Sequence, residues 1–180
     1  VLMRSAAGGA KTITLTKVFD TATALNTEAS KGGFGLLDET DVKKVEINES
    51  GDAFANVAQI EKIAEAKGDD ASKVVYTKIK DSATALSDYV DAGAAGKYIN
   101  GKPVVIKESG GIFTDVDKLI KINTKASSVT LTKVKDLASK LVTEAAKGNS
   151  SVIKSKTVVL NEAGAATTHA TVANIDSILA

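Results

Sequence analysis

The sequence predicts an α/β protein whose parallel sheet of about six strands is built by three tandem units of strand–helix–strand–helix. Two observations predict this fold: one strand-and-helix pattern occurs three times, and a second, different pattern alternates with it. Parallel strands need a crossover connection such as a helix between them. We expect a solenoid-like, repetitive sheet with helices on one face, and a compact α/β sandwich with the sheet in the middle is the alternative.

The first pattern is a strand that ends at an aspartate and is followed by a helix. Near the start of the chain, Ile13 and Leu15 alternate with threonines, which is typical of a half-buried strand. Aspartate is a strong N-cap, because its carboxylate accepts free N–H groups of the first helical turn. Helix caps are therefore predicted at Asp20, Asp81 and Asp136. Aligned on these aspartates, a Thr-Lys pair recurs at Thr16-Lys17, Thr77-Lys78 and Thr132-Lys133.

The second pattern is a strand that runs into a glycine turn and then a helix. The three segments are 45–51, 104–110 and 158–164, and their glycines, predicted to form the turns, are Gly51, Gly110 and Gly164. Pro103 opens the second of these strands, where a missing N–H costs little. Apolar residues then recur at helical spacing, and the predicted helix caps are Asn56, Asp115 and one of Thr167, Thr168 and Thr171.

The repeats set the expected domain organisation. Residues 1–10 are predicted to be a tail, and residues 11–180 a single repeat domain with units of approximately 11–71, 72–126 and 127–180. Each strand-and-helix half has one apolar face that it cannot bury alone. Stacking of neighbouring units then forms a continuous core.

Composition excludes several functional classes. The net charge is +1, and Arg4 is the only arginine, so the sequence has no concentrated basic footprint and predicts no nucleic-acid partner. The chain has no cysteine, which excludes disulfides, thiolate metal sites and cysteine nucleophiles. No apolar run reaches the roughly 18 residues of a membrane-spanning helix, so no membrane span is expected.

His169 is the only histidine, and a catalytic triad or a histidine-ligated metal would depend on it. It lies near the position that Phe54 and Phe113 hold in the other units, where a partly buried ring is the favoured interpretation. The sequence contains no phosphate-binding or dinucleotide-binding glycine motif. We therefore predict that the chain is not an enzyme and needs no cofactor.

Acidic side chains cluster at three places where oxygen ligands could suit Ca²⁺, and Asp115/Asp117 is one of them. The weak candidates for calcium are the other two, Asp38/Asp41 and Asp69/Asp70. They match no EF-hand loop, and solvated caps are the favoured interpretation. A third acidic set, Glu49, Glu108 and Glu162, is expected to line up on successive strands. It would form either an exposed charged comb or a periodic surface that binds a polyanion or glycan.

The two patterns, Thr-Lys-Val/Ile-x-Asp-x-Ala-x-x-Leu and Val-x-Ile-x-Glu-Ser-Gly, resemble the strand–helix repeats of large secreted bacterial surface proteins of the S-layer and RTX types. The resemblance extends from about Thr12 to Ala180. It implies a structural or adhesive role at the cell surface or outside the cell, with neighbouring repeats of a longer chain or other copies as partners. The calcium-binding nonapeptides of RTX proteins are missing here, so a calcium roll is not implied. The acid of the second pattern also departs from the family, being glutamate where aspartate is usual.

The function expected from these observations is a non-enzymatic structural or adhesive repeat domain of a secreted bacterial cell-surface protein. The alternative is a module that binds glycan or lipopolysaccharide on its exposed sheet face.

Overall fold

The computed structural model describes residues 16–32, 36–38, 42–92, 96–108, 113–161 and 171–179. These residues form a mixed α/β structure with six α-helices and three small sheets, in place of the single sheet of about six strands that the repeats predict. Two of the sheets have three strands each, in the order in which the strands follow along the chain, and the third sheet has two strands. The chain divides into two compact units, Val1–Lys80 and Asp81–Ala180.

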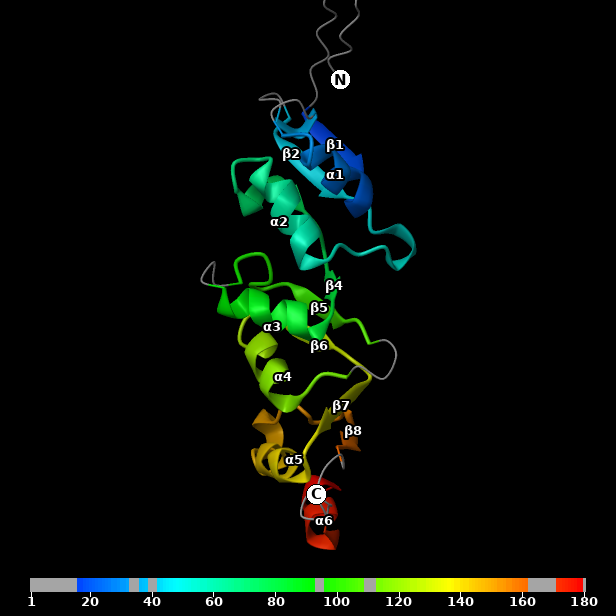
Figure 1. Ribbon diagram of the computed structural model, residues 1–180, viewed down its shortest axis with the longest axis vertical. Coiled ribbons are helices and arrows are strands. Elements are labelled where there is room, and N and C mark those ends of the chain that lie inside the picture. Colours follow the sequence, from blue (N-terminus) through cyan, green and yellow to red (C-terminus); the bar gives the residue numbers. More distant parts are fainter. Residues whose placement is uncertain are drawn as a thin grey trace, which may run out of the picture. The chain divides into compact units, whose positions relative to one another are not determined.

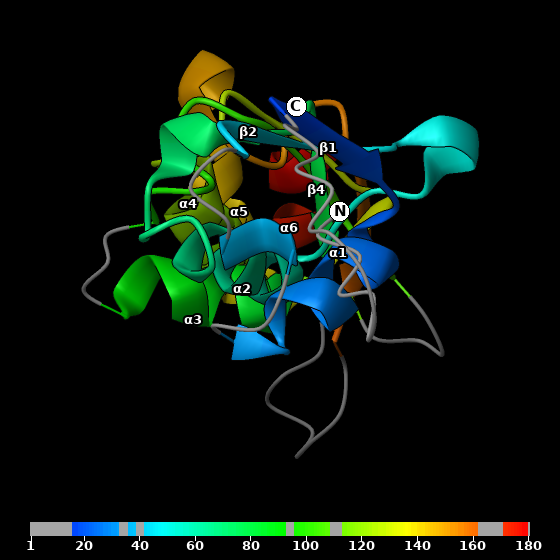
Figure 2. The ribbon, with the colours of Figure 1, turned by 90° about the horizontal axis from the view of Figure 1, so that it is seen from above.

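The first unit begins with β1 (Lys17–Asp20), α1 (Ala22–Ala29) and β2 (Lys44–Ile47), and continues with α2 (Val57–Glu65) and β3 (Val74–Val75). The strands are parallel, and Val45 of β2 pairs with Val18 on one side and Val74 on the other. Figure 2 shows α1 and α2 together on one side of β1 and β2. The predicted strand–helix alternation is therefore present in this unit.

The core of the first unit lies between its sheet and its helices. Val45 and Ile47 are buried while Lys44 and Glu46, which point to the opposite face, are not, as the two-residue period of a strand requires. The helices contribute buried aliphatic side chains at helical spacing, namely Leu25, Ala29, Val57, Ile60 and Ile63. Asn56 caps α2 as predicted, and it forms a capping box with Gln59.

The strand β4 (Ile79–Asp81) leads into the second unit. There α3 (Ala83–Asp91), β5 (Pro103–Ile106), α4 (Val116–Asn123) and β6 (Ser128–Thr130) follow. The chain continues with β7 (Lys133–Asp136), α5 (Ala138–Ala145), β8 (Thr157–Leu160) and α6 (Val172–Leu179). The pairs β5–β6 and β7–β8 are parallel. In Figure 1, α3, α4 and α5 lie on one side of β5 to β8.

Aliphatic side chains also fill the core of the second unit, with Val104, Ile106, Leu119, Ile122, Val134 and Leu141 all buried. Two further predictions about helix starts are confirmed. Asp115 caps α4 by accepting the N–H of Lys118 at 2.8 Å, and the Thr171 hydroxyl accepts the N–H of Asn174 at 3.2 Å ahead of α6. Pro103 is the first residue of β5, as expected.

The segments predicted as one strand before Asp81 and Asp136 are each divided into two strands. Val74–Val75 pairs with β2 and Ser128–Thr130 pairs with β5, whereas β4 and β7 join the next sheet along the chain. The division falls at residues 76–78 and 131–132. This change of partner explains why the strands form three small sheets and not one.

Candidate functional site

The change of sheet partner is marked by a glutamate that holds the backbone at the break. Glu108 follows β5, and its carboxylate accepts hydrogen bonds from the N–H of Thr132 at 3.2 Å and of Lys133 at 3.1 Å. The Thr132 hydroxyl donates to the same carboxylate. The Lys133 Nζ lies 5.7 Å from the centre of the Phe113 ring, within reach of a cation–π interaction.

The same arrangement occurs in the first unit. The Glu49 carboxylate accepts from the N–H of Thr77 at 2.9 Å and of Lys78 at 3.3 Å, and from the Thr77 hydroxyl. The Lys78 Nζ lies 5.4 Å from the centre of the Phe54 ring. We call these two four-residue sets, Glu49-Phe54-Thr77-Lys78 and Glu108-Phe113-Thr132-Lys133, the glutamate clasps.

The clasps revise the interpretation of the repeated glutamates. Glu49 follows β2 and Glu108 follows β5, and these strands belong to different sheets, so the two acids do not form a ladder on neighbouring strands. Each carboxylate is occupied by two backbone N–H groups and a hydroxyl, which are charge-assisted hydrogen bonds. Glu162, the third member, lies outside the described residues.

The three aspartates predicted to be N-caps each lie one residue before the N-cap. The carboxylates of Asp20, Asp81 and Asp136 accept the N–H of the next residue at 2.7, 2.8 and 2.8 Å. The N-cap positions belong to those next residues, Thr21, Ser82 and Leu137. The aspartate therefore fixes the strand-to-helix turn, and in the first two cases a hydroxyl completes the cap.

Asp136 has a second role, since it joins the starts of two helices. Its Oδ1 accepts the N–H of Leu137 before α5, and its Oδ2 accepts the N–H of Val116 in α4 at 3.1 Å. The side chain is buried, with 7% of the residue exposed. Thr114 adds a backbone link alongside, because the N–H of Lys135 donates to its carbonyl at 2.9 Å.

Two further glutamates, which sequence reasoning missed, hold loops. Glu144 in α5 is 2% exposed, accepts the N–H of Val152 at 2.9 Å and pairs with Lys147. Glu28 in α1 does the same for the N–H of Leu36 at 2.6 Å and pairs with Lys31. The hydrogen bond from Leu36, with that from Lys31, lowers the pKa of Glu28 below its ordinary value.

A signal for these two glutamates was present in the sequence. Glu28 and Glu144 each lie eight residues after the aspartate of the first pattern, at the same helical position. Tyr89 holds that position in the middle unit, where its ring stacks on Tyr98 with centroids 6.2 Å apart.

Of the predicted turn glycines, Gly51 lies in the described residues. Its φ of 65° falls in the left-handed region, which glycine adopts without a steric penalty, in the turn directly after Glu49 and Ser50. Gly110 and Gly164 lie outside the described residues.

Of the calcium candidates, Asp69 and Asp70 lie in the part of the chain that the structure describes. Asp70 caps a 3₁₀ helix, accepts from the N–H and hydroxyl of Ser72 at 2.9 and 2.7 Å, and its pKa is lowered by these hydrogen bonds. Its neighbour Asp69 is exposed. Asp41 and the Asp38 side chain lie outside the described residues. Within the described ranges, no three metal-ligating side chains form a group that could hold an ion.

The face of the first sheet opposite its helices carries two exposed apolar side chains, one on each side of a glutamate. Phe19, Glu46 and Val75 are in register across the three strands, and Phe19 is 56% and Val75 38% exposed. Lys17 pairs with Glu46 on the same face. An exposed aromatic ring beside a carboxylate and an ammonium group is the kind of surface on which a sugar could stack.

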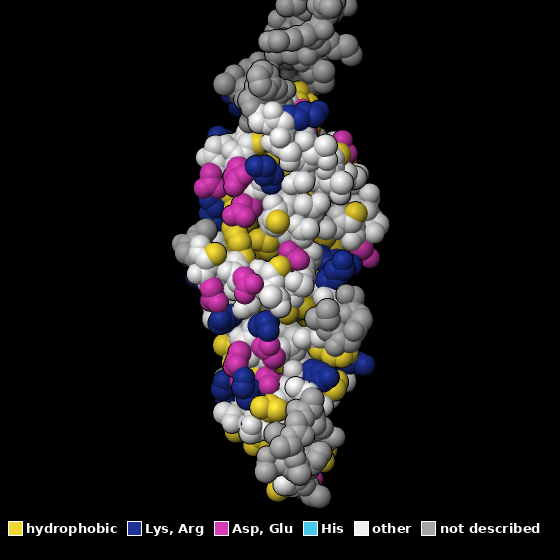
Figure 3. All heavy atoms as spheres, in the orientation of Figure 1, with side chains coloured by type: hydrophobic (Ala, Val, Ile, Leu, Met, Phe, Trp, Pro, Cys, Tyr) yellow, Lys and Arg dark blue, Asp and Glu magenta, His cyan; other side chains and the backbone are white. Residues whose placement is uncertain are grey.

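Charge elsewhere is mixed in sign. Figure 3 shows lysine and acidic side chains interspersed on the face drawn. Two ion pairs connect helices of the second unit, Lys121 with Asp91 and Lys140 with Asp117, and in both the carboxylate raises the pKa of the lysine. His169 lies outside the described residues.

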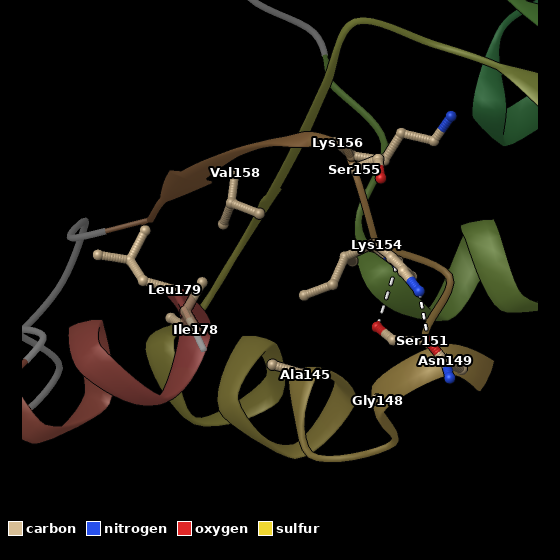
Figure 4. Close-up of a pocket in the computed structure, with 11 residues that line it drawn as sticks. Ala145, Gly148, Asn149, Ser151, Lys154, Ser155, Lys156, Val158, Ile178 and Leu179 are labelled. Atoms are coloured by element: carbon tan, nitrogen blue, oxygen red, sulfur yellow. Dashed lines mark hydrogen bonds between the residues drawn. The ribbon is translucent and has the colours of Figure 1, made fainter.

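A cavity of about 340 Å³ opens beside β8 in the second unit. Val158 of β8 and Ile178 and Leu179 of α6 line its apolar side, and Figure 4 shows these three side chains grouped around the same space. The other side is polar, with Asn149, Ser151 and Lys154 among its residues.

None of the helices in the described ranges has both the length and the apolar character needed to cross a bilayer. In comparisons with protein families, curated proteins and solved structures, none matches the chain.

Proposed function

We propose that the chain is a non-enzymatic structural repeat module of a secreted bacterial cell-surface protein, of the S-layer or adhesin type, arranged as a solenoid-like array. The observation that carries this proposal is the use made of the recurring acids. Glu49 and Glu108 bind backbone N–H groups about one helix and one strand further along the chain. The recurring glutamates therefore form hydrogen bonds that fix the backbone.

The same conclusion is supported by Asp136 and Glu144, which are both buried. A carboxylate that acts as a general base or nucleophile must face a substrate. The Asp136 oxygens instead hold the starts of α4 and α5, and the Glu144 oxygens hold Val152 and Lys147. In a surface protein, such internal clasps would keep successive modules ordered.

Surface labelling tests the proposal directly. Antibodies raised against the folded chain are applied to intact and to permeabilised cells of the source organism, with an antibody against a cytosolic protein as control. Labelling of intact cells, and its loss after brief treatment of the cells with an external protease, is the expected result. Labelling confined to permeabilised cells would overturn the proposal.

The row formed by Phe19, Glu46 and Val75 favours one alternative, a glycan- or lipopolysaccharide-binding module. Its test is binding of the chain to immobilised glycans and lipopolysaccharide, with Phe19→Ala against Lys62→Ala, an exposed lysine of α2, as the matched control. Saturable binding that Phe19→Ala abolishes and Lys62→Ala retains would establish the alternative. Equal behaviour of the two variants would exclude this face as the binding surface.

A further inference from the structure

The face of the first sheet that lies opposite α1 and α2, which we call the outer face, departs from the repeat. Phe19 of β1 comes directly before Asp20, whereas Lys135 comes directly before Asp136 in the corresponding strand β7. Phe19 is 56% exposed. A large aromatic side chain therefore stands in water where another unit has a lysine, and it adds nothing to the core between the sheet and its helices.

The residue beside Phe19 departs from the repeat as well. Glu46 lies three residues before the glutamate of the second pattern, and Val105 and Val159 hold that position in the other sheets. Glu46 is in register with Phe19 on one side and with Val75, which is 38% exposed, on the other. The exposed aromatic ring therefore has a carboxylate beside it where the repeat provides an apolar side chain.

Two lysines complete the outer face, and they differ in their partners. Lys17 pairs with Glu46, so these two charges compensate each other. Lys44 is in register with Lys17, is exposed, and has no ion-pair partner among the described residues. The uncompensated charge on this face is therefore the ammonium group of Lys44.

The aromatic ring and the ammonium group are close enough to contact one ligand. Alternate residues of a strand are about 7 Å apart and neighbouring strands about 5 Å apart, so Lys44 and Phe19 lie about 8 Å apart on the diagonal between β2 and β1. The flexible four-carbon stem of a lysine bridges much of this distance. A ring-shaped ligand stacked on Phe19 therefore has its rim within reach of the Lys44 ammonium group.

We propose that the outer face of the first sheet binds an acidic polysaccharide whose sugars are hexuronic acids. The apolar C–H face of one sugar ring stacks on Phe19 beside Val75, and its carboxylate pairs with Lys44. The sugar hydroxyls donate to Glu46, which Lys17 holds in place. The inference rests on the glycan-binding alternative described above and adds the class of sugar.

Charge is what selects an acidic sugar over a neutral one. A carboxylate on the ligand gives Lys44 the partner that Glu46 gives Lys17, and hydrogen bonds between charged groups are stronger than neutral ones. A neutral sugar leaves the Lys44 ammonium group without that partner. Because the pair is exposed, its contribution is modest and decreases as the salt concentration rises.

Titration calorimetry of the whole chain with two probes tests the proposal. The probes are a short oligomer of galacturonic acid and its methyl ester, which has the same sugar rings but no charge. We expect saturable binding of the acid, about fivefold tighter than binding of the ester at low salt. The difference between the two probes should shrink as salt is added, because salt screens the exposed charges.

Three variants separate the stacking contact from the charge contact. Phe19→Ala should abolish binding of both probes. Lys44→Gln should lower the affinity for the acid to that for the ester and leave binding of the ester unchanged. Lys62→Gln is the matched control, because it removes an exposed lysine of α2, on the other side of the sheet, and should bind both probes as the unaltered chain does. Circular dichroism verifies that all variants fold.

Three outcomes would overturn the inference: no saturable binding of the acid, equal affinity for the acid and the ester, or equal behaviour of Lys44→Gln and Lys62→Gln. Equal affinity for the two probes that Phe19→Ala abolishes would retain the glycan-binding alternative and reject only the acidic sugar. Failure to bind either probe leaves the surface labelling of cells untouched, so the inference and the proposed structural role can fail independently.

Discussion

The Glu108 carboxylate accepts a hydrogen bond from the N–H of Thr132, a residue 24 positions further along the chain, at 3.2 Å. The same carboxylate reaches the N–H of Lys133 at 3.1 Å and thereby spans the point where β6 ends and β7 begins. The chain changes from one sheet to the next at this point. The glutamate therefore holds the backbone N–H groups of both residues at this break.

Removing the charge of Glu108 should destabilise the second unit. Glu108→Gln keeps the length of the side chain but replaces one accepting oxygen by an NH₂ donor, which cannot accept from Thr132 or Lys133. Hydrogen bonds to charged groups contribute about 1.5–3 kcal/mol, and partial exposure reduces this, so we expect a loss of about 1–2 kcal/mol. Urea unfolding followed by circular dichroism measures it.

The matched control is Glu46→Gln, because Glu46 forms an exposed ion pair with Lys17 and touches no clasp. Exposed ion pairs contribute about 0–1 kcal/mol, so its effect should be smaller. Equal effects of the two substitutions would show that the clasp has no special role.

Asp136→Asn should be more damaging than Asp20→Asn. The two Asp136 oxygens accept N–H groups from Leu137 and Val116 in a buried setting, and asparagine can accept at only one of them. One buried N–H left unsatisfied costs about 1–3 kcal/mol. Asp20 is exposed and its carboxylate accepts the N–H of Thr21, so its substitution should cost about 0.5 kcal/mol or less. Thermal unfolding of both variants would reveal the difference, and identical melting curves would contradict it.

Glu144→Gln tests the loop contact in α5. The carboxylate is buried between the Val152 N–H and the Lys147 ammonium, and a glutamine must present its NH₂ group to one of these two donors. We expect a loss of about 1–3 kcal/mol in the free energy of unfolding. Glu28→Gln alters the aligned contact, where the glutamate side chain is 23% exposed, and should lose less. A larger loss for Glu28→Gln would contradict this account.

The stability of the second unit should depend on pH through Asp115. Burial alone would raise the pKa of Asp115, but hydrogen bonds from the Lys118 side chain and N–H outweigh it, and the pKa lies below its ordinary value. The ionised form of Asp115 is therefore favoured in the folded state. Its contribution to the free energy of unfolding is complete above the unfolded pKa of about 3.9 and is lost as the pH falls below that value.

Asp115→Asn isolates this effect, because asparagine is an equally good N-cap but cannot pair with Lys118. The variant should be less stable than the unaltered chain at pH 7, and the two should converge as the pH falls below about 4. Asp88→Asn, on the exposed side of α3, is the control. A difference between Asp115→Asn and the unaltered chain that stays constant across this range would contradict the assignment.

Local structure was predictable from the sequence because caps and periodic apolar residues act over a few positions. Asn56 and Asp115 were correctly assigned as caps, Thr171 was one of three candidate caps for the last helix, and Pro103 was correctly placed as the first residue of a strand. The aspartate positions were shifted by one residue. An aspartate one residue before the N-cap and an aspartate at the N-cap give the same sequence pattern. In the structure the hydroxyls of Thr21 and Ser82 form the cap, which places the aspartate one residue before it.

Sheet organisation was less predictable, because pairing joins residues far apart in the chain. The run from Val129 to Asp136 has the composition of one strand. The break between β6 and β7 at Thr132 becomes apparent only in the folded chain, where Glu108 accepts a hydrogen bond from Thr132. The glutamate and the threonine of the clasp were both visible as recurring residues, since each repeats at the same position of its pattern. Their spacing of 24 residues contains a helix, so the sequence alone did not show that they meet.

Amide hydrogen exchange at Thr132 and Lys133 tests the central claim, that a glutamate clasp fixes the backbone where the chain changes sheets. We expect both amides to exchange slowly in the unaltered chain and to lose most of that protection in Glu108→Gln, while amides in the middle of α4 change little. Rapid exchange at Thr132 and Lys133 in the unaltered chain, or protection that persists in Glu108→Gln, would contradict the claim.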